Sequence, residues 1–410
     1  MLQKIKNISR APTARKTAAL YTGIMLNVAL GYVVTKLNTA WLSVEQFGMF
    51  SLFINTLFFM RAFLSFGLFE AASRLLAVEP EVSHTRRYLA ATLTLTLFLG
   101  LLLSLSILIL SRFFDAVFET RIGFLLWTFW PLAVVVMLQG MLQITLRGLS
   151  YIRLLSVYMF LPRLLYVLLM AALMAAGLFT LKSTLLTFLL TLLVVSLWLI
   201  YRLQPQFTEW KSYIGRLLQE VREFGAHLYL ANILTAFIYH SDKLILAYFI
   251  DARQLAYYAL AFALTMPITH FSKALSTSAY KNFANQTRLD RRFLLTNFAY
   301  IAAAASGIIL LRHFIITDLF SAEFLPSIPP LIVLAIAFAF SGLSVPYTMF
   351  FKAQKRGREV RNITFTVQLV FVAGNLILIP WFGIMGAAWA TLIAFVLDYG
   401  LYVIQYRLKY

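Results

Sequence analysis

Long apolar stretches alternate with short polar ones along nearly the whole chain. A membrane-spanning helix needs about 20 consecutive, mostly apolar residues to cross the hydrocarbon layer. By that criterion the pattern predicts about twelve spans, at 17–40, 47–76, 88–111, 122–146, 154–179, 183–202, 223–250, 254–281, 293–312, 326–351, 361–380 and 385–406. Because the apolar runs are continuous and lack the alternation of barrel strands, we predict an all-α, polytopic membrane protein.

The widest polar connector, 203–222, divides these spans into two sets of six. Leu20-Tyr21 in the first half recurs as Leu228-Tyr229 in the second, which favours an internal repeat. Halves with six spans each cross the membrane in the same direction, so we expect two pseudo-symmetric lobes around a central cavity. The predicted division is an N-lobe at 1–202, a cytoplasmic linker at 203–222 and a C-lobe at 223–410.

Composition supports a membrane protein. Of the 410 residues, 61% are hydrophobic and 12% charged, whereas a soluble domain has about a quarter charged residues. The net charge of +19 is concentrated in alternate loops and both tails, which places these segments and both termini in the cytoplasm. The predicted outer loops hold few basic residues, namely Arg112, Arg121, Lys182, Arg253 and Arg312. The basic excess is therefore explained by topology, and we expect no nucleic-acid partner.

Catalytic chemistry has little support in the sequence. There is no Cys, so thiolate nucleophiles, thiolate metal sites and disulfides are excluded. Gly-rich phosphate loops are absent, and the histidines show no metal-ligand spacing. The predicted outer loops 112–121 and 313–325 are too short for a catalytic domain. We therefore expect neither an enzyme nor a metal or organic cofactor.

Basic side chains within the spans are the candidates for binding an anionic substrate, because a charge at mid-membrane costs about 2.5–3.5 kcal/mol and usually faces a wet interior. Arg61 lies near the middle of the second span. His270 and Lys273, three residues apart in the eighth span, share a helix face. The predicted substrate-binding residues are Arg61, Lys273, Lys243, Lys36, His270 and Arg163. Structural pairing with acidic residues, or snorkelling to the membrane surface, is the alternative for each.

Three acidic residues lie inside predicted spans: Asp242, Glu70 and Asp398. Each could bind a coupling ion, H+ or Na+, or serve as a buried structural partner. Asp242 and Lys243 are adjacent, so their Cβ directions differ by about 100° on a helix. We therefore expect Lys243 to face the cavity and Asp242 to face a neighbouring helix.

The last two spans carry the most specific motif, N-x-x-L-x-P-x-x-G-x-x-G-A-A-x-A-T, at Asn375, Pro380, Gly383, Gly386, Ala387, Ala388, Ala390 and Thr391. Its small residues allow a neighbouring helix to approach closely. The L-S-x-E-x-F-G turn ending at Gly48 and the stretch after Asp242 add to the pattern, although Ala256 replaces a common Gly. The chain resembles Wzx-type flippases of the polysaccharide transporter family, within the MOP superfamily.

This resemblance implies the two-lobe MOP fold and alternating access, with cavity cations at Lys36, Arg61 and Lys273. It implies an undecaprenyl-pyrophosphate-linked oligosaccharide, such as an O-antigen unit, moved from the cytoplasmic to the periplasmic leaflet of a bacterial inner membrane. Membrane lipids and glycan-assembly proteins such as a polymerase are the expected partners, and we expect a monomer. The alternatives are a cation-coupled multidrug (MATE-like) exporter, a lipid II flippase and, from another class, a membrane polymerase or ligase. The driving force stays open between protons, sodium, membrane potential and mass action.

Overall fold

The computed structural model describes residues 12–79, 81–118, 122–226, 229, 233, 242–354 and 356–409. Within those ranges every regular element is helical, so the all-α prediction is confirmed for the described chain. The elements are α2 Pro12–Trp41, α3 Val44–Leu64, α4 Leu68–Val78, α5 Val82–Phe118, α6 Gly123–Phe129, η1 Trp130–Ala133, α7 Val134–Gly148, α8 Ile152–Ala175, α9 Leu181–Leu203, α10 Trp210–Glu220, η2 Val221–Gly225, α12 Asp242–Phe249, α13 Ala252–Thr265, α14 Ile268–Ser278, α15 Tyr280–Asn285, α16 Arg291–Leu310, α17 Arg312–Phe314, η4 Ile315–Phe320, η5 Ala322–Ser327, α18 Ile328–Ala353 and α19 Gly357–Lys409.

Eight helical stretches of the described chain are long and apolar enough to cross a membrane, which makes this a multi-pass membrane protein. The longest, α19, contains two of the predicted spans. They are separated at Gly383, which leaves the helical conformation at φ 54° and ψ −131°. Much of the predicted span 223–250 lies outside the described residues, and α12 is its described end.

Two predicted spans are single helices in the sequence interpretation but pairs of helices in the structure. Span 47–76 divides into α3 and α4 because Phe66 (φ 45°) and Gly67 (φ 73°) adopt the left-handed conformation. Gly67 also lies directly against the backbone of Gly225, where a Cβ on either residue would overlap the other. Span 254–281 divides into α13 and α14 at Pro267, whose ring cannot continue the hydrogen-bond ladder. Hydropathy sums over both breaks and so missed them.

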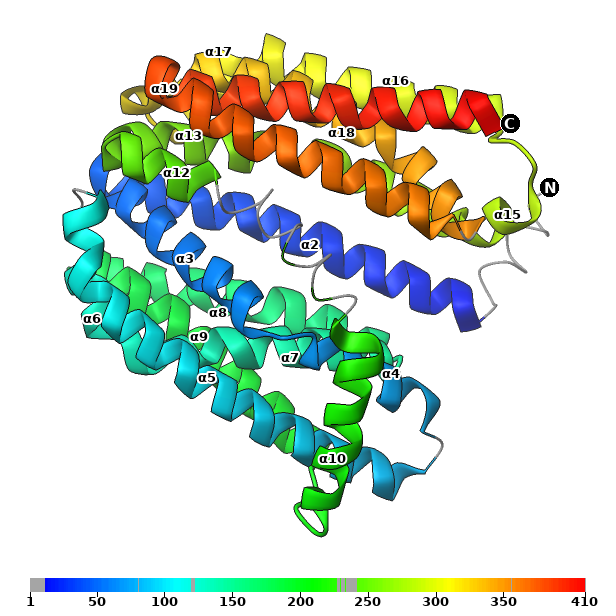
Figure 1. Cartoon of the computed structure of the whole chain (residues 1–410). Helices are drawn as coiled ribbons and strands as arrows, with labels where there is room; N and C mark the ends of the chain where they lie inside the picture. The colour runs from blue at the N-terminus through cyan, green and yellow to red at the C-terminus, as the bar shows by residue number, and fades with distance from the viewer. Residues whose placement is uncertain are drawn as a thin grey trace. The chain divides into compact units, whose positions relative to one another are not determined.

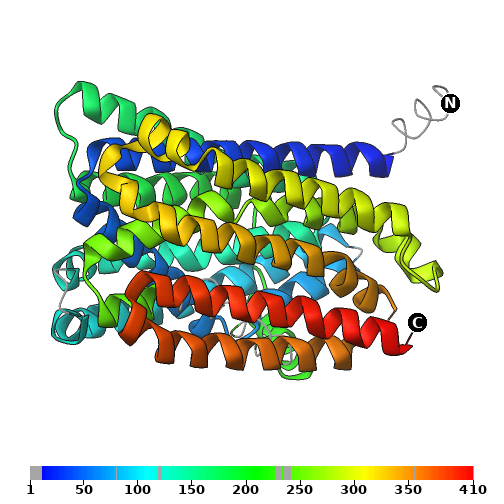
Figure 2. The same ribbon diagram turned by 90° about the horizontal axis from the view of Figure 1, so that it is seen from above.

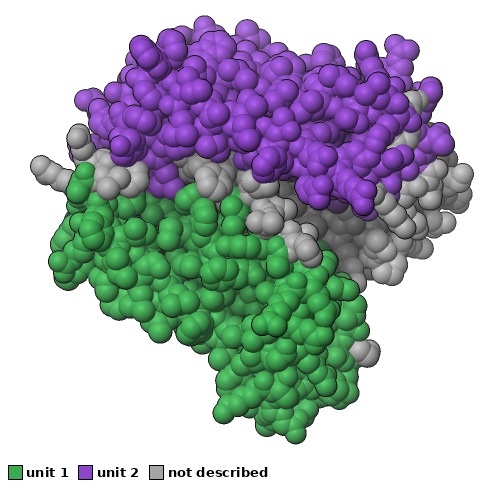
Figure 3. Space-filling view, viewed as in Figure 1, with its two compact units in different colours: residues 1–37, 56–116, 121–233 green, residues 38–55, 117–120, 234–410 purple. Residues whose placement is uncertain are grey.

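The described residues form two compact units, coloured separately in Figure 3. Unit 1 comprises 1–37, 56–116 and 121–233, and unit 2 comprises 38–55, 117–120 and 234–410. Unit 2 therefore includes the turn between α2 and α3. Within it, Phe47 packs edge-on against Phe324 with ring centroids 5.8 Å apart, and Gly48 lies against the backbone of Ala252.

In unit 1, α7 is central and packs against α4, α8 and α9. The α9 helix starts with a capping box, in which Thr180 accepts from the Ser183 amide and Ser183 accepts from the Thr180 amide. Farther along, the buried Tyr158 hydroxyl of α8 is 2.8 Å from the Ser196 hydroxyl of α9. Burying a hydroxyl without a partner is costly, so this bond fixes how α8 and α9 pack.

In unit 2, α18 is central and lies against α13, α14, α16 and α19 (Figures 1 and 2). One part of the unit 2 core is aromatic and includes Phe350, Phe351, Phe371 and Tyr402. The two halves of α19 approach closely where Gly386 lies against the Leu378 backbone. Gly386, a small residue of the C-terminal motif, therefore allows the close helix approach that the sequence predicted.

The predicted linker contains a short amphipathic helix, α10, within unit 1. Its Tyr213 ring is buried edge-on against Tyr88, with centroids 4.7 Å apart. Two ion pairs flank this contact: Arg87 to Glu209 at 3.0 Å and, on the other side, Arg74 to Glu220 at 2.6 Å. This part of the linker is thus docked on the unit and is no free tether.

Candidate functional site

Arg61 is the most suggestive basic residue of unit 1. It lies on α3 and its guanidinium Nη1 donates to Gln139 Oε1 of α7 at 3.1 Å and, more weakly, to Val136 O at 3.5 Å. The guanidinium carbon lies 4.8 Å from the Phe58 ring centroid. A bulkier residue at Gly140 would crowd the Arg61 side chain. The sequence thus holds Arg61 in one orientation through its neighbours.

The rest of the guanidinium is the chemically useful part. Among the described residues, the structure gives Nε and Nη2 no hydrogen-bond partner, although Glu70 and Tyr158 lie near enough to interact electrostatically. The Arg61 side chain is half-buried. A guanidinium anchored through Nη1 therefore keeps a donor edge available for an anion such as phosphate.

The other basic candidates of unit 1 are placed differently. Arg163 of α8 directs Nη1 onto the backbone oxygen of Asn27 in α2. Gly31 allows this contact, since a Cβ there would lie 2.7 Å from the same nitrogen. Arg163 thus makes a structural contact with the backbone of α2, and its role in substrate binding stays a prediction. Lys36, near the end of α2, is exposed.

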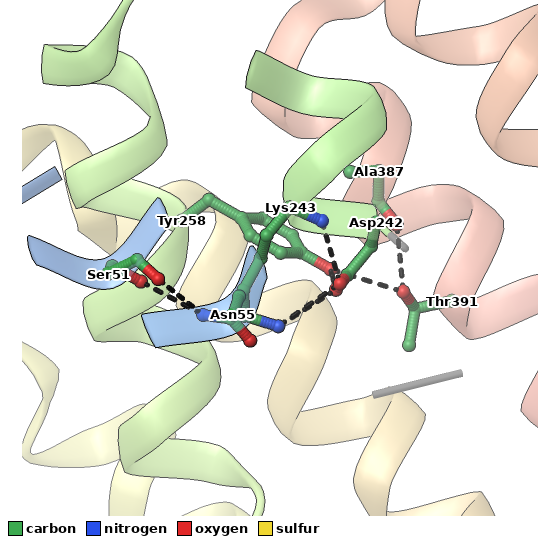
Figure 4. Close-up of polar contacts among 7 residues, drawn as sticks. All are labelled: Ser51, Asn55, Asp242, Lys243, Tyr258, Ala387 and Thr391. Carbon is green, nitrogen blue, oxygen red and sulfur yellow. Dashed lines mark hydrogen bonds and ion pairs between the residues drawn. The ribbon is translucent and has the colours of Figure 1, made fainter. Parts of the chain in front are cut away.

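A buried ion pair dominates the polar part of unit 2 (Figure 4). Asp242 is fully buried and Lys243 is 4% exposed. The Lys243 ammonium lies 3.1 Å from Asp242 Oδ1 and 3.3 Å from Oδ2. Tyr258 of α13 donates to Asp242 Oδ2 at 2.8 Å. Asp242 thus contacts a neighbouring helix, as the sequence interpretation expected.

Lys243 departs from that expectation, because it turns back onto Asp242. Helix geometry fixes the Cβ directions but does not limit where a long lysine side chain ends. Here four methylene groups carry the ammonium back to the carboxylate, beneath the Phe262 ring at 3.6 Å from its centroid. Adjacent residues can therefore pair even though their side chains leave the helix in different directions.

The remaining candidates lie on separate helices of unit 2. His270 and Lys273 are both on α14 and both half-buried. Asp398 of α19 is within hydrogen-bonding reach of Ser344 on α18, close to Tyr402. Since Arg61 is in unit 1 and Lys273 in unit 2, the cationic cavity shared by the two halves stays a prediction.

Sequence reasoning missed the neutral partners of these charges. Gln139 and Tyr258 decide how Arg61 and Asp242 are held, but neither stands out in an apolar run. One usable signal was present: a buried tyrosine hydroxyl needs a hydrogen-bond partner, and the Tyr257-Tyr258 pair lies one short helix after Asp242. Nothing comparable marks Gln139.

Comparison with protein families settles the chain's affiliation. The family described as "Polysaccharide biosynthesis protein" matches residues 13–280. The chain belongs to this family. None of the curated proteins matches it in sequence to a significant degree.

Solved structures show the same fold at low sequence identity. "Lipid II flippase MurJ, inward closed conformation" superposes with a TM-score of 0.75 and 16% identity, over 95% of this chain and 87% of that one. An inward-facing multidrug resistance MATE family transporter of the MOP superfamily gives 0.72 and 16%, over 94% of both chains. The MATE transporter DinF-BH gives 0.69 and 14%, over 97% and 96%. The chain therefore has the MOP fold, which it shares with this lipid II flippase and these multidrug transporters.

Proposed function

We propose that this protein is a flippase for undecaprenyl-pyrophosphate-linked oligosaccharides, such as O-antigen units. It moves them from the cytoplasmic to the periplasmic leaflet of a bacterial inner membrane by alternating access. The family and the fold, shared with a lipid II flippase, support a lipid-linked glycan as the cargo. With both termini in the cytoplasm, the most basic loops face the leaflet from which the substrate is taken.

The observation that carries this proposal is the way in which the Arg61 guanidinium is held. Its guanidinium is anchored through Nη1, while its other donors make no hydrogen bond to the described residues. A pyrophosphate oxygen pair matches that planar donor edge, and the partly apolar surroundings strengthen the attraction. His270 and Lys273 on α14 are the proposed second contact, with Lys36 as a more peripheral one.

The experiment replaces Arg61 in cells whose export of the lipid-linked glycan depends on this protein. We expect Arg61→Gln to reduce export about tenfold or more, since one charge-assisted hydrogen bond is worth about 1.5–3 kcal/mol. Arg61→Lys keeps the charge but not the fork, so it should fall between Gln and wild type. Surface glycan is measured at matched protein abundance.

Arg74→Gln is the matched control, because Arg74 is also in unit 1 but pairs with Glu220 at an exposed site. Export at wild-type level in Arg61→Gln, with normal abundance, would refute the assignment of Arg61. A double substitution with Lys273→Gln then tests the second contact. If both charges act on one substrate, their effects will not be additive.

A cation-coupled multidrug exporter is the second candidate, favoured by the MATE transporters among the fold neighbours. Cationic drugs need acidic or neutral binding sites, and the unit 1 site is built around a guanidinium. Drug susceptibility of a deletion strain separates the two functions. Loss of a drug exporter makes the cells more sensitive to the drugs that it exports, whereas loss of a flippase removes no drug-export activity. A lipid II flippase is separated by whether the protein sustains cell-wall synthesis when the resident lipid II flippase is depleted.

A further inference from the structure

We infer that Asp242, Tyr258 and Phe262 form a monovalent-cation site and that the Lys243 ammonium is its permanent occupant. This assigns Lys243 a role other than the substrate binding that its sequence suggested. The inference concerns how the proposed transport is driven, and that consequence rests on the proposed function. The cation site itself lies entirely within unit 2.

The carboxylate of Asp242 has no acceptor capacity left for a second cation. A carboxylate offers about four lone-pair directions, and here four contacts use them. Oδ1 accepts from the Lys243 amide at 2.8 Å and from the Lys243 ammonium at 3.1 Å. Oδ2 accepts from Tyr258 at 2.8 Å and lies 3.3 Å from the same ammonium. An external ion could bind only by displacing the lysine.

The surroundings of the ammonium are those of a cation receptor. Its nitrogen lies 3.6 Å from the centroid of Phe262 and 5.8 Å from that of Tyr258. Aromatic faces combined with a carboxylate are a typical site for ammonium ions. The pair is closed to solvent, since Asp242 is fully buried and Lys243 is 4% exposed.

Thr391 and Ala387 of α19 form the edge of the hydrogen-bonded cluster around Asp242. Thr391 Oγ1 donates to Ala387 O at 2.9 Å and lies 3.4 Å from the Tyr258 hydroxyl (Figure 4). Each hydroxyl has a single hydrogen. Tyr258 gives its hydrogen to Asp242 and Thr391 gives its own to the backbone, so this cluster is complete without a bound ion. We conclude that no external metal cation is taken up at Asp242.

The test is cation-dependent thermal stability of the purified full-length protein in detergent. Melting is followed in sodium chloride, N-methylglucamine chloride and propylammonium chloride at equal ionic strength. Propylammonium is what Lys243→Ala removes from the side chain. We expect wild type to melt at the same temperature in all three salts. Lys243→Ala should melt lower and recover with propylammonium, by about 1–2 °C for each tenfold excess over the dissociation constant in a chain of this length.

Three variants serve as controls. The double variant Asp242→Asn/Lys243→Ala should not respond to propylammonium, and Lys243→Arg should behave like wild type. Lys182→Ala removes a lysine that also lies over a ring, 4.5 Å from the Phe124 centroid, but is exposed. Its melting should be independent of the added cation. Neutral n-propanol separates charge from simple cavity filling.

Two results would overturn the inference. One is saturable stabilisation of wild type by sodium that Asp242→Asn abolishes, because an external ion would then reach the carboxylate despite Lys243. This measurement still decides the matter if Lys243→Ala fails to fold. The other is a folded Lys243→Ala that ignores propylammonium. Neither result depends on glycan export, so failure of the cation site and failure of the flippase proposal are distinguishable. If both proposals hold, export into the outer leaflet of proteoliposomes is unchanged when sodium is replaced by N-methylglucamine.

Discussion

Breaking the Asp242–Lys243 pair from either side should destabilise the protein more than removing both charges together. Lys243→Met keeps most of the side-chain volume but leaves a fully buried carboxylate without its counter-ion. Asp242→Asn leaves an almost fully buried ammonium. Removing one partner of a buried pair costs about 3–5 kcal/mol, whereas replacing both with neutral groups is often close to neutral. We therefore expect the double variant to be more stable than either single variant.

The measurement is a double-mutant cycle on the unfolding free energy in detergent, with all four proteins in one buffer. In the double variant, Tyr258 can still donate to the Asn oxygen, which preserves the contact between α12 and α13. The exposed pair of Arg74 and Glu220 provides the comparison cycle, and its coupling should be about 0–1 kcal/mol. Additive losses at Asp242 and Lys243 would show that the pair does not act as one unit.

Two further predictions concern packing. Gly386→Ala should lower the free energy of unfolding by about 1–3 kcal/mol, because its Cβ would overlap the Leu378 backbone. Gly400→Ala on the same helix is the control: its Cβ meets no atom within 4 Å, so it should be neutral or slightly stabilising. Thermal melting measures both. Tyr213→Ala should release α10 and speed protease cleavage of the linker. Tyr213→Phe keeps the ring contact and should be cut at the wild-type rate. Equal cleavage of all three proteins would exclude docking through this ring.

Hydropathy was sufficient to predict the helical class and the approximate position of most spans, because crossing a membrane demands long apolar runs. The breaks inside spans depend on local conformation instead. Phe66 adopts a left-handed φ of 45°, for which a phenylalanine has no sequence preference, so its residue type does not mark this break. The Gly383 turn was easier to predict, because Pro380 and Gly383 interrupt an apolar run and both residue types are typical of turns.

Charges could be located from the sequence, but their partners could not. Arg61 and Asp242 stand out because ionised residues are rare in spans, so both were found as candidates. Their environments come from residues distant in sequence, such as Gln139 for Arg61 and Tyr258 for Asp242. Lys243 shows the opposite difficulty, since its partner is the adjacent residue, and side-chain flexibility rather than helix geometry determines the pairing.

The membership of 38–55 in unit 2 has a consequence for biosynthesis. This turn leaves the ribosome early, yet its packing partners Ala252 and Phe324 follow some two hundred residues or more later. At about 5–20 residues per second, the turn must remain unpacked for roughly 10 s or longer. Unit 2 therefore closes late in synthesis, and a chain severed in the linker would yield two fragments, of which the second lacks a piece of its own core.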